Sequence, residues 1–339
     1  MLRDLAALPK AHLHLHLEGA MRPATLREWS DEDGVEVPPV RPFEGFGAFA
    51  DLYVSACQRV QDETRMRRLV REVVEDAAAD GVTWLEPTFY APRYAGVLGP
   101  TARDAIEVVL DELVGAGSDL GVGTGLIVSS DRTADPAEAL ELAHLAVTLA
   151  AEGHAVIGFG LANDESRFPA GPFAPAFRVA VDGGLLAVPH GGELLGPESV
   201  RACVDDCRAH RVMHGIRCVE DPELVKRLAD DGVCLDVCPT SNLALSVVAT
   251  MAEHPLPELI AAGVMCSINA DDPLLFGPGV AEEYDLCRAV LGLSDETLAQ
   301  VAIWSIEASA APQDFVARQA AAVQAWLSSP GWPIRGGPA

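Results

Sequence analysis

The sequence predicts a single TIM-type (β/α)8 barrel with a helical lid inserted after the first strand, and two observations indicate this fold. A short apolar run followed by helical periodicity occurs eight times along the 339 residues. The runs are apolar on both faces, as parallel strands are when helices cover the sheet. The expected strands are residues 11–18, 82–90, 121–130, 155–163, 185–192, 211–215, 233–238 and 264–270.

Helical segments fit between most of these strands. Residues 64–79 place apolar side chains at helical spacing. Pro136 can open a helix through residue 151, and Asp221 can cap a helix over 222–229. The glycine-rich stretch at 121–125 runs into a strand, so it indicates a turn and strand packing rather than a phosphate-binding loop.

The first connection differs from the others. Residues 19–63 are far longer than a usual βα loop. We expect them to form a helical insertion that lies over the barrel mouth as a lid. Residues 1–327 are then one barrel domain, and 328–339 form a flexible tail. The insertion is rich in aromatic residues, namely Trp29, Phe43, Phe46, Phe49 and Tyr53.

Composition excludes several classes of partner. Lys+Arg is 24 against Asp+Glu 50, and no basic run could follow a nucleic-acid backbone. No apolar run reaches the roughly 18 residues that span a bilayer, and the first ten residues lack the core of a signal peptide. We expect a cytoplasmic protein with a small-molecule substrate, no nucleic-acid or membrane partner, and an oligomeric state that the sequence leaves open. The eight cysteines include no CxxC pair, which favours reduced core residues.

Three histidines occur on the first expected strand. His12, His14 and His16 alternate with leucines, so all three point to one face of the strand. In a barrel that face can be the interior. A histidine-rich tract or hydrogen-bonded core histidines would give the same local pattern.

Residues elsewhere favour a functional interpretation. His190 and Glu193 follow the fifth strand, His214 ends the sixth, and Asp271 and Asp272 end the eighth. TIM barrels carry their catalytic groups at these carboxyl ends. Three imidazoles and one carboxylate suit one Zn²⁺ with an open position for water, although iron or cobalt could fill such a site.

Four ordered motifs carry a resemblance to a known family. They are PKAHLHLHLEGA at 9–20, HGGE at 190–193, MHG at 213–215 and SINADDP at 267–273. The chain resembles the adenosine deaminase family of metal-dependent hydrolases over nearly its whole length. The resemblance implies hydrolytic replacement of the 6-amino group of an adenine-type ring. It also implies the metal ligands, which are His14, His16, His190 and Asp271.

The same resemblance implies roles for the remaining polar residues. Glu193 protonates ring N1, His214 helps to orient and deprotonate the attacking water, and Asp272 contacts N7. Glu193 must then be protonated when substrate binds, which an apolar site favours. His12 stands where the family usually has another residue, so we expect it to support the core or the ligands.

The lysine content favours one metal over two. Related two-metal barrels use a carbamylated lysine on the fourth strand, but the expected fourth strand has none. Lys10 and Lys226 are the only lysines in the sequence, and neither is suitably placed.

Several positions depart from the family pattern, and they concern substrate rather than reaction. Glu18 replaces the aspartate taken to contact a ribose 5′-hydroxyl, and Asn163 replaces a glycine expected near purine N3. Met213 and Ala270 also depart from the pattern. These changes argue against plain adenosine as the best substrate.

Arg132, at the end of the third expected strand, bears on the substrate. Its guanidinium could bind a substrate carboxylate in bidentate fashion, or it could be a loop arginine paired with Asp131. A carboxylate favours 6-aminodeoxyfutalosine, an intermediate of menaquinone synthesis, with adenosine and adenine as alternatives. A catalytically silent metal-binding barrel is the alternative from another class.

Overall fold

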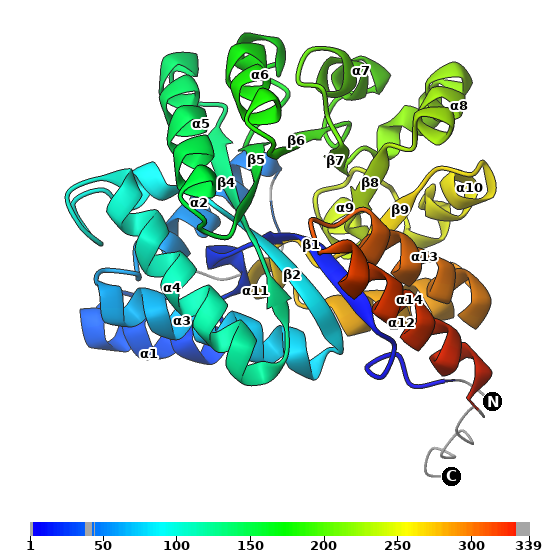
Figure 1. Cartoon of the computed structure of the whole chain (residues 1–339), viewed down its shortest axis with the longest axis horizontal. Helices are drawn as coiled ribbons and strands as arrows, with labels where there is room; N and C mark the ends of the chain where they lie inside the picture. The colour runs from blue at the N-terminus through cyan, green and yellow to red at the C-terminus, as the bar shows by residue number, and fades with distance from the viewer. Residues whose placement is uncertain (1–2, 38–42, 44, 330–339) are drawn as a thin grey trace.

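The computed structural model describes residues 3–37, 43 and 45–329 and shows the expected barrel (Figure 1). Its main strands are parallel and follow one another around the sheet in chain order. A parallel bridge between Leu15 and Asp271 joins the last strand segment to the first. The strands are β1 (Lys10–His16), β2 (Val82–Phe89), β4 (Leu126–Asp131), β5 (Val156–Ala162), β6 (Leu186–Gly191), β7 (Arg211–His214), β8 (Cys234–Val237) and β9 (Cys266–Ile268), with the two-residue β3 (Gly123–Thr124) paired to β2.

Helices surround the strands (Figure 1). The α-helices are α1 (Pro23–Asp33), α2 (Phe46–Cys57), α3 (Glu63–Ala79), α4 (Ala102–Leu120), α5 (Pro136–Ala151), α6 (Ala174–Asp182), α7 (Pro197–Asp205), α8 (Pro222–Asp231), α9 (Pro239–Ala244), α10 (Leu256–Ala261), α11 (Pro273–Phe276), α12 (Val280–Ala289), α13 (Asp295–Glu307) and α14 (Gln313–Ser328). Short 3-10 helices are η1 (Glu18–Ala20), η2 (Ala91–Tyr94), η3 (Gly171–Phe173), η4 (Ile216–Glu220) and η5 (Met251–Glu253). The predicted cap is present, because the Asp221 carboxylate accepts hydrogen bonds from the first turn of α8.

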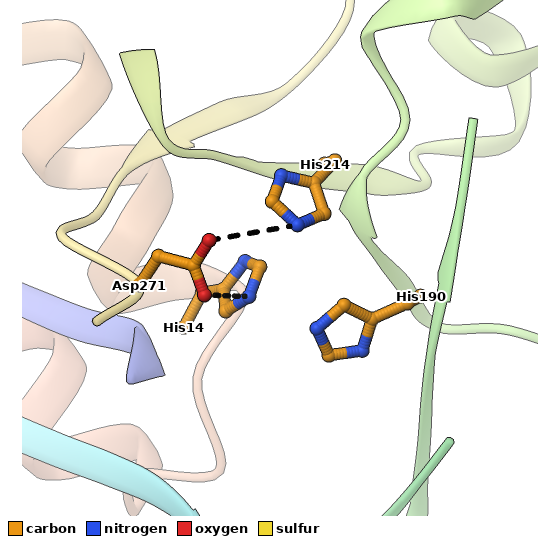
Figure 2. A group of neighbouring side chains, drawn as sticks. All are labelled: His14, His190, His214 and Asp271. Carbon is orange, nitrogen blue, oxygen red and sulfur yellow. Dashed lines mark ion pairs between the residues drawn. The ribbon is translucent and has the colours of Figure 1, made fainter. Parts of the chain in front are cut away.

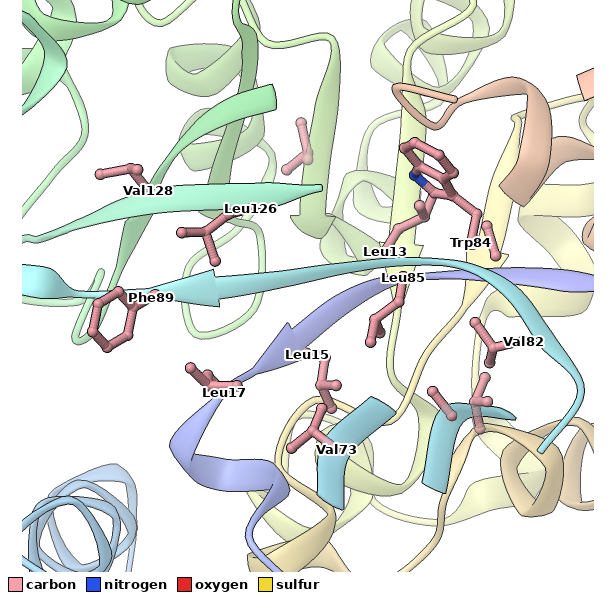
Figure 3. Packing of buried hydrophobic residues seen from close by; sticks show 14 of the residues in the cluster. Leu13, Leu15, Leu17, Val73, Val82, Trp84, Leu85, Phe89, Leu126 and Val128 are labelled. Atoms are coloured by element: carbon pink, nitrogen blue, oxygen red, sulfur yellow. The ribbon is translucent and has the colours of Figure 1, made fainter. Parts of the chain in front are cut away.

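Alternation along β1 separates its core face from its polar face. Leu13, Leu15 and Leu17 belong to the large buried cluster that also contains Val73 of α3 and Leu85 of β2 (Figure 3). The intervening histidines therefore point to the opposite face, into the barrel. Burying the leucine face against the helices fixes the direction in which the histidines point.

The insertion after β1 is helical, as expected, but its two helices pack differently. α1 lies against α3, where Arg22 pairs with Asp76 at 2.7 Å and Thr25 donates to Glu72 at 2.6 Å. Trp29 is buried on this side, with the Arg65 guanidinium 5.4 Å from its ring. By contrast, α2 contributes aromatic side chains to a cavity at the carboxyl ends of the strands. Of these two helices, α2 lines the cavity and α1 does not.

A charged network fills the amino-terminal end of the barrel. Arg211 is buried and donates to Glu86 at 2.6 Å and to Asp236 at 2.9 Å. Glu86 also accepts from the Trp84 indole at 2.7 Å, and Asp236 accepts from the Ser267 hydroxyl at 2.7 Å. We call Arg211, Glu86 and Asp236 the floor triad.

The two terminal segments of the described chain pack together. Arg3 pairs with Asp295 at 3.1 Å, and the Trp326 indole donates to the Asp4 carbonyl at 2.8 Å. α14 extends to Ser328, so the first residue of the predicted tail is helical, and 330–339 lie outside the described residues. All eight cysteines are buried and free. None of the helices in the described ranges combines the length and apolar character needed to cross a membrane.

Candidate active site

Histidines from three strands meet an aspartate at the carboxyl ends of the strands (Figure 2). Nε2 of His14 and Nε2 of His16 each lie 3.3 Å from Asp271 Oδ1. His16 Nε2 lies 3.2 Å from His190 Nε2, and His214 Nε2 lies 3.8 Å from Asp271 Oδ2. The structure therefore gathers three of the predicted ligands, His14, His190 and Asp271, with His214 into one group whose donor atoms lie within 4.8 Å of one another. His16, the fourth predicted ligand, forms an adjoining group with Asp271 and Asp272.

The predicted histidine ligands each have one ring nitrogen engaged and the other available. His14 and His190 donate from Nδ1 to main-chain carbonyls at 3.0 and 2.9 Å. His16 Nδ1 lies 3.0 Å from the Thr88 hydroxyl, which itself donates to a β1 carbonyl. Such contacts orient neutral imidazoles with Nε2 free for a metal.

Two buried polar atoms test whether a cation fits here. His14 Nε2 and Asp272 Oδ1 have no hydrogen-bond partner among the described residues. An unpartnered buried nitrogen is costly unless something else satisfies it. Three imidazole nitrogens and a carboxylate are a donor set suited to Zn²⁺, so the residues fit a divalent metal.

Left-handed backbone aims several of these side chains. The φ angles of Asn163, His214 and Asp271 are 84°, 65° and 60°, which is uncommon for residues other than glycine. The turn at Asp271 is held on both sides, because its N–H donates to His14 O at 3.1 Å and its carbonyl accepts from His16 N at 3.0 Å. Strain of this kind persists where surrounding structure imposes it, often at active sites.

Close backbone approach explains one glycine of the first motif. A Cβ atom on Gly19 would lie 1.6 Å from Asp272 Oδ1. Asp272 is buried, and burial together with the neighbouring Asp271 raises its pKa well above the ordinary value. A glycine at position 19 leaves room for this buried carboxyl group.

Glu193 lies on a tight turn after β6. Its Oε1 is 3.6 Å from His214 Nε2. The turn is held by Glu165, whose carboxylate accepts from Gly192 N at 3.0 Å and from Leu195 N at 2.6 Å. Glu165 therefore positions the backbone on either side of Glu193.

Electrostatics around Glu193 favour its acid form. Burial raises the pKa of Glu193 well above its usual range, and the charges of Asp271 and Glu165 raise it further. Burial also lowers the pKa of His214 to about 3, so this imidazole is neutral at pH 7. A protonated carboxyl group thus faces a neutral imidazole across the site.

A hydrogen-bond chain fixes the tautomer of His214. Leu256 N–H donates to His254 Nδ1 at 3.1 Å, and burial lowers the pKa of His254 to about 4. The proton of neutral His254 is then on Nε2, which donates to Asn242 Oδ1 at 3.1 Å. The Asn242 amide in turn donates to His214 Nδ1 at 3.2 Å. The proton of His214 is therefore on Nε2, directed at the ligand cluster.

A cavity of about 760 Å³, including its open side, adjoins this cluster. Its lining includes six predicted site residues from the strand ends, namely His16, Asn163, His190, Glu193, His214 and Asp271. Asp272 also faces it, while Phe46, Phe49 and Tyr53 of α2 form the apolar wall. A concave apolar space with a few convergent polar groups is typical of a small-molecule site.

Comparison with known proteins agrees with this geometry. The family model described as adenosine deaminase matches residues 9–326. The chain belongs to the adenosine deaminase family. A putative adenosine/adenine deaminase of Streptomyces virginiae is 44% identical over 96% of this chain and 98% of that protein. Aminodeoxyfutalosine deaminase of Streptomyces coelicolor is 33% identical over 96% and 87% of the two chains. The crystal structure of an adenine deaminase from Arthrobacter aurescens superposes with a TM-score of 0.88 at 31% identity, covering 95% of this chain and all of that one.

Two predicted substrate contacts do not line the cavity in this member of the adenosine deaminase family. Arg132 is buried and donates to the carbonyls of Phe168, at 3.0 Å, and His190. It therefore supports a predicted metal ligand. Glu18 is also buried and accepts from the Tyr53 hydroxyl at 3.0 Å, so it contacts the cavity wall rather than the cavity.

Sequence reasoning missed Tyr90 and Arg93, which line the cavity after β2. A signal was available, because aromatic and charged residues directly follow a strand there, in TFYAPRY at 88–94. Asn242 and His254 were also missed. They act on His214 only through tertiary contacts, which neighbouring sequence does not reveal.

The remaining predictions concern the residues that flank the ligands on β1. His12 is buried and its Nε2 accepts from Ala270 N at 3.1 Å, which holds the chain next to Asp271. Lys10 lies at the opposite end of β1 and donates to the carbonyls of Leu5 and Asp80 at 3.0 and 2.5 Å. It is therefore placed away from the ligand cluster.

Proposed function

We propose that this member of the adenosine deaminase family hydrolyses the 6-amino group of an aminopurine, with one Zn²⁺ held by His14, His16, His190 and Asp271. The observation that carries the proposal is the group formed by His14, His190 and Asp271, with His16 Nε2 3.3 Å from Asp271 Oδ1. Glu193, whose pKa burial raises well above its usual range, lies beside this group. The family match supports the reaction class.

In this proposal Glu193 and Asp271 transfer protons, and His214 orients the attacking oxygen. A bound divalent metal supplies activation by lowering the pKa of its water from 15.7 to about 7. Glu193 gives its proton to ring N1 while oxygen adds at C6, which neutralises the charge that develops on the ring. His214, with its proton on Nε2 and its Nδ1 accepting from Asn242, donates a hydrogen bond that orients the attacking oxygen. It therefore does not take the deprotonating role that the family resemblance implied. Asp271 accepts the proton that later leaves with ammonia, and the second proton of water restores Glu193.

The cavity bears on the choice of substrate. It reaches from the ligand cluster to Tyr53, Tyr90 and Arg93, and so offers space beyond a purine ring. We therefore favour a nucleoside-type substrate over free adenine. 6-Aminodeoxyfutalosine is the leading candidate, supported by the 33% identical relative, and adenosine and adenine are the alternatives. Reactions on such metabolites fit a cytoplasmic enzyme.

The test is deamination by the zinc-loaded protein, followed by absorbance and ammonia release. Adenine, adenosine and 6-aminodeoxyfutalosine are compared side by side, and we expect kcat/KM above about 10⁴ M⁻¹s⁻¹ for one of them. Bound metal is measured on the same sample, with one equivalent expected. One equivalent of metal without turnover of any aminopurine would instead favour a catalytically silent metal-binding barrel.

A further inference from the structure

Arg93 is a cation on the cavity wall that the proposed reaction does not use. It lies in η2, directly after β2, and is half-buried. Its guanidinium carbon is 5.7 Å from the centroid of the Tyr53 ring and 5.8 Å from that of Tyr90. All three residues line the cavity that contains Glu193. The guanidinium is thus held by two aromatic rings beside the space where substrate binds.

The hydrogen-bonding groups of Arg93 have no partner among residues 3–37, 43 and 45–329. Its Nε is buried without a hydrogen bond, and no ion pair forms with a described carboxylate. Many other arginines in the described ranges are paired with a carboxylate, as Arg65 is with Asp33 at 2.9 Å. Arg132, which is also near the cavity, is taken up by main-chain carbonyls.

The acidic side chains around the cavity wall are engaged with other groups. Glu18 accepts from Tyr53 at 3.0 Å, and Glu138 accepts from Tyr90 at 2.6 Å. Asp131 accepts from the Asn163 amide at 3.1 Å. The charge of buried Glu18 acts on Arg93, but none of these three carboxylates forms a hydrogen bond or ion pair with it in the described chain. The N–H groups of Arg93 therefore remain for a ligand.

Arginine in this setting is suited to an anion. Its guanidinium matches carboxylate and phosphate groups in bidentate geometry, and stacking on aromatic rings fixes its plane beforehand. The chain has a formal net charge of −26, so long-range repulsion opposes the entry of an anionic ligand. A local cation is then needed to hold such a ligand.

We propose that Arg93 binds a carboxylate or phosphate on the part of the substrate that lies beyond the purine ring. The inference rests on the proposed function and narrows its substrate class to anionic adenine nucleosides. Arg93 takes the specificity role that the sequence suggested for Arg132.

The experiment compares three substrates on four zinc-loaded proteins. Adenosine is neutral, adenosine 5′-monophosphate carries a phosphate, and 6-aminodeoxyfutalosine carries a carboxylate. The proteins are wild type, Arg93→Gln, Arg93→Lys and the control Arg178→Gln, which changes an exposed arginine on α6. The wild type should prefer one anionic substrate over adenosine by at least about tenfold, since a hydrogen bond to a charged group contributes about 1.5–3 kcal/mol.

Removing the Arg93 charge should erase that preference. In Arg93→Gln, kcat/KM for the anionic substrate should fall by about 10- to 100-fold more than kcat/KM for adenosine, mainly through KM. Arg93→Lys should fall between wild type and Arg93→Gln, because it keeps charge but loses the bidentate fork. Arg178→Gln should match wild type on all three substrates. Which anionic substrate is preferred distinguishes phosphate from carboxylate.

Two outcomes separate failure of this inference from failure of the proposed function. If aminopurines are deaminated but Arg93→Gln loses equal activity on neutral and anionic substrates, the anion role is wrong and the deaminase stands. If no aminopurine is deaminated, calorimetric titration of the three deaminated products decides the point. Tighter binding of an anionic product by wild type than by Arg93→Gln supports the anion subsite, and equal binding overturns it.

Discussion

The two ends of the barrel interior both bury charged groups, yet they satisfy them differently. In the floor triad, Arg211 donates to the carboxylates of Glu86 and Asp236, and each carboxylate has a further donor. At the carboxyl end, buried His14 Nε2 and Asp272 Oδ1 accept or donate no hydrogen bond within the described chain, although His14 Nε2 lies 3.3 Å from Asp271 Oδ1. Buried polar groups without hydrogen bonds are costly, so these two atoms favour a ligand at the carboxyl end.

An apolar layer separates these two ends. Ile127 of β4, Val188 of β6 and Met213 of β7 form a buried cluster of their own. Each lies one or two residues before a site residue or cavity residue on its strand. The side chains of the floor triad can therefore be altered separately from those of the site, although the Asp236 carbonyl accepts a hydrogen bond from His14.

Removing one predicted metal ligand at the carboxyl end of the barrel should have the largest effect on activity. His14→Ala should lose bound metal and lower kcat/KM by about 10⁴-fold or more, since metal activation of water is worth several kcal/mol. His144→Ala, on the exposed face of α5, is the control. Metal content by mass spectrometry and steady-state kinetics check both variants. A His14→Ala protein with full metal and more than a tenth of wild-type activity would remove His14 from the ligand set.

The role of Glu193 as an acid should be separable from metal binding by mutation. Glu193→Gln keeps the shape of the side chain but cannot protonate N1, so we expect full metal content and a kcat about 10²- to 10⁴-fold lower. Glu198→Gln, an exposed position in the first turn of α7, should retain wild-type kcat. Near wild-type turnover by metal-loaded Glu193→Gln would contradict the acid role.

The floor triad should affect stability instead. Arg211→Met leaves two buried carboxylates without their cation, so the free energy of unfolding should fall by about 3–5 kcal/mol. Adding Glu86→Gln and Asp236→Asn should restore part of this loss. Arg227→Met, which breaks an exposed 2.7 Å pair with Asp205, should cost less than about 1 kcal/mol.

Urea denaturation measures these changes, and activity per folded molecule is measured in parallel. For Arg211→Met we expect activity to fall less than tenfold, because the triad touches the site only through the Asp236 carbonyl that holds His14. A large loss of specific activity with unchanged stability would reverse the roles of the two ends.

Sequence periodicity accounts for what was predictable. The alternation of leucine and histidine on β1 fixed which side chains face the barrel, and the strand termini located His190, Glu193, His214 and Asp271. These positions follow from the strand period of two and from the rule that parallel strands present their carboxyl ends at one edge. Both depend on local sequence alone.

What could not be predicted depends on the path of the chain beyond a strand. Arg132 and Arg93 both lie close to strand ends. The direction of the turn after each strand decides that Arg132 donates to main-chain carbonyls and that Arg93 lines the cavity. Likewise α1 and α2 both carry buried aromatics, and tertiary packing places only those of α2 among the described cavity-lining residues. Side-chain direction outside regular structure has no sequence period to reveal it.

His254 offers the test with the smallest expected effect. It lies at the carboxyl end of the barrel, where both of its ring nitrogens are hydrogen-bonded. Burial lowers its pKa from 6.5 to about 4, so between these values the folded chain binds fewer protons here than the unfolded chain. Its contribution to stability is present above pH 6.5 and is lost as pH falls toward 4. From pH 7 to pH 5 this group alone should lower the free energy of unfolding by about 2 kcal/mol. His254→Gln lacks that loss, so denaturation of the metal-free proteins at both pH values should show a shallower pH dependence in the variant. Equal pH dependence in the two proteins would mean that His254 is not held neutral, and the tautomer assigned to His214 would lose its basis.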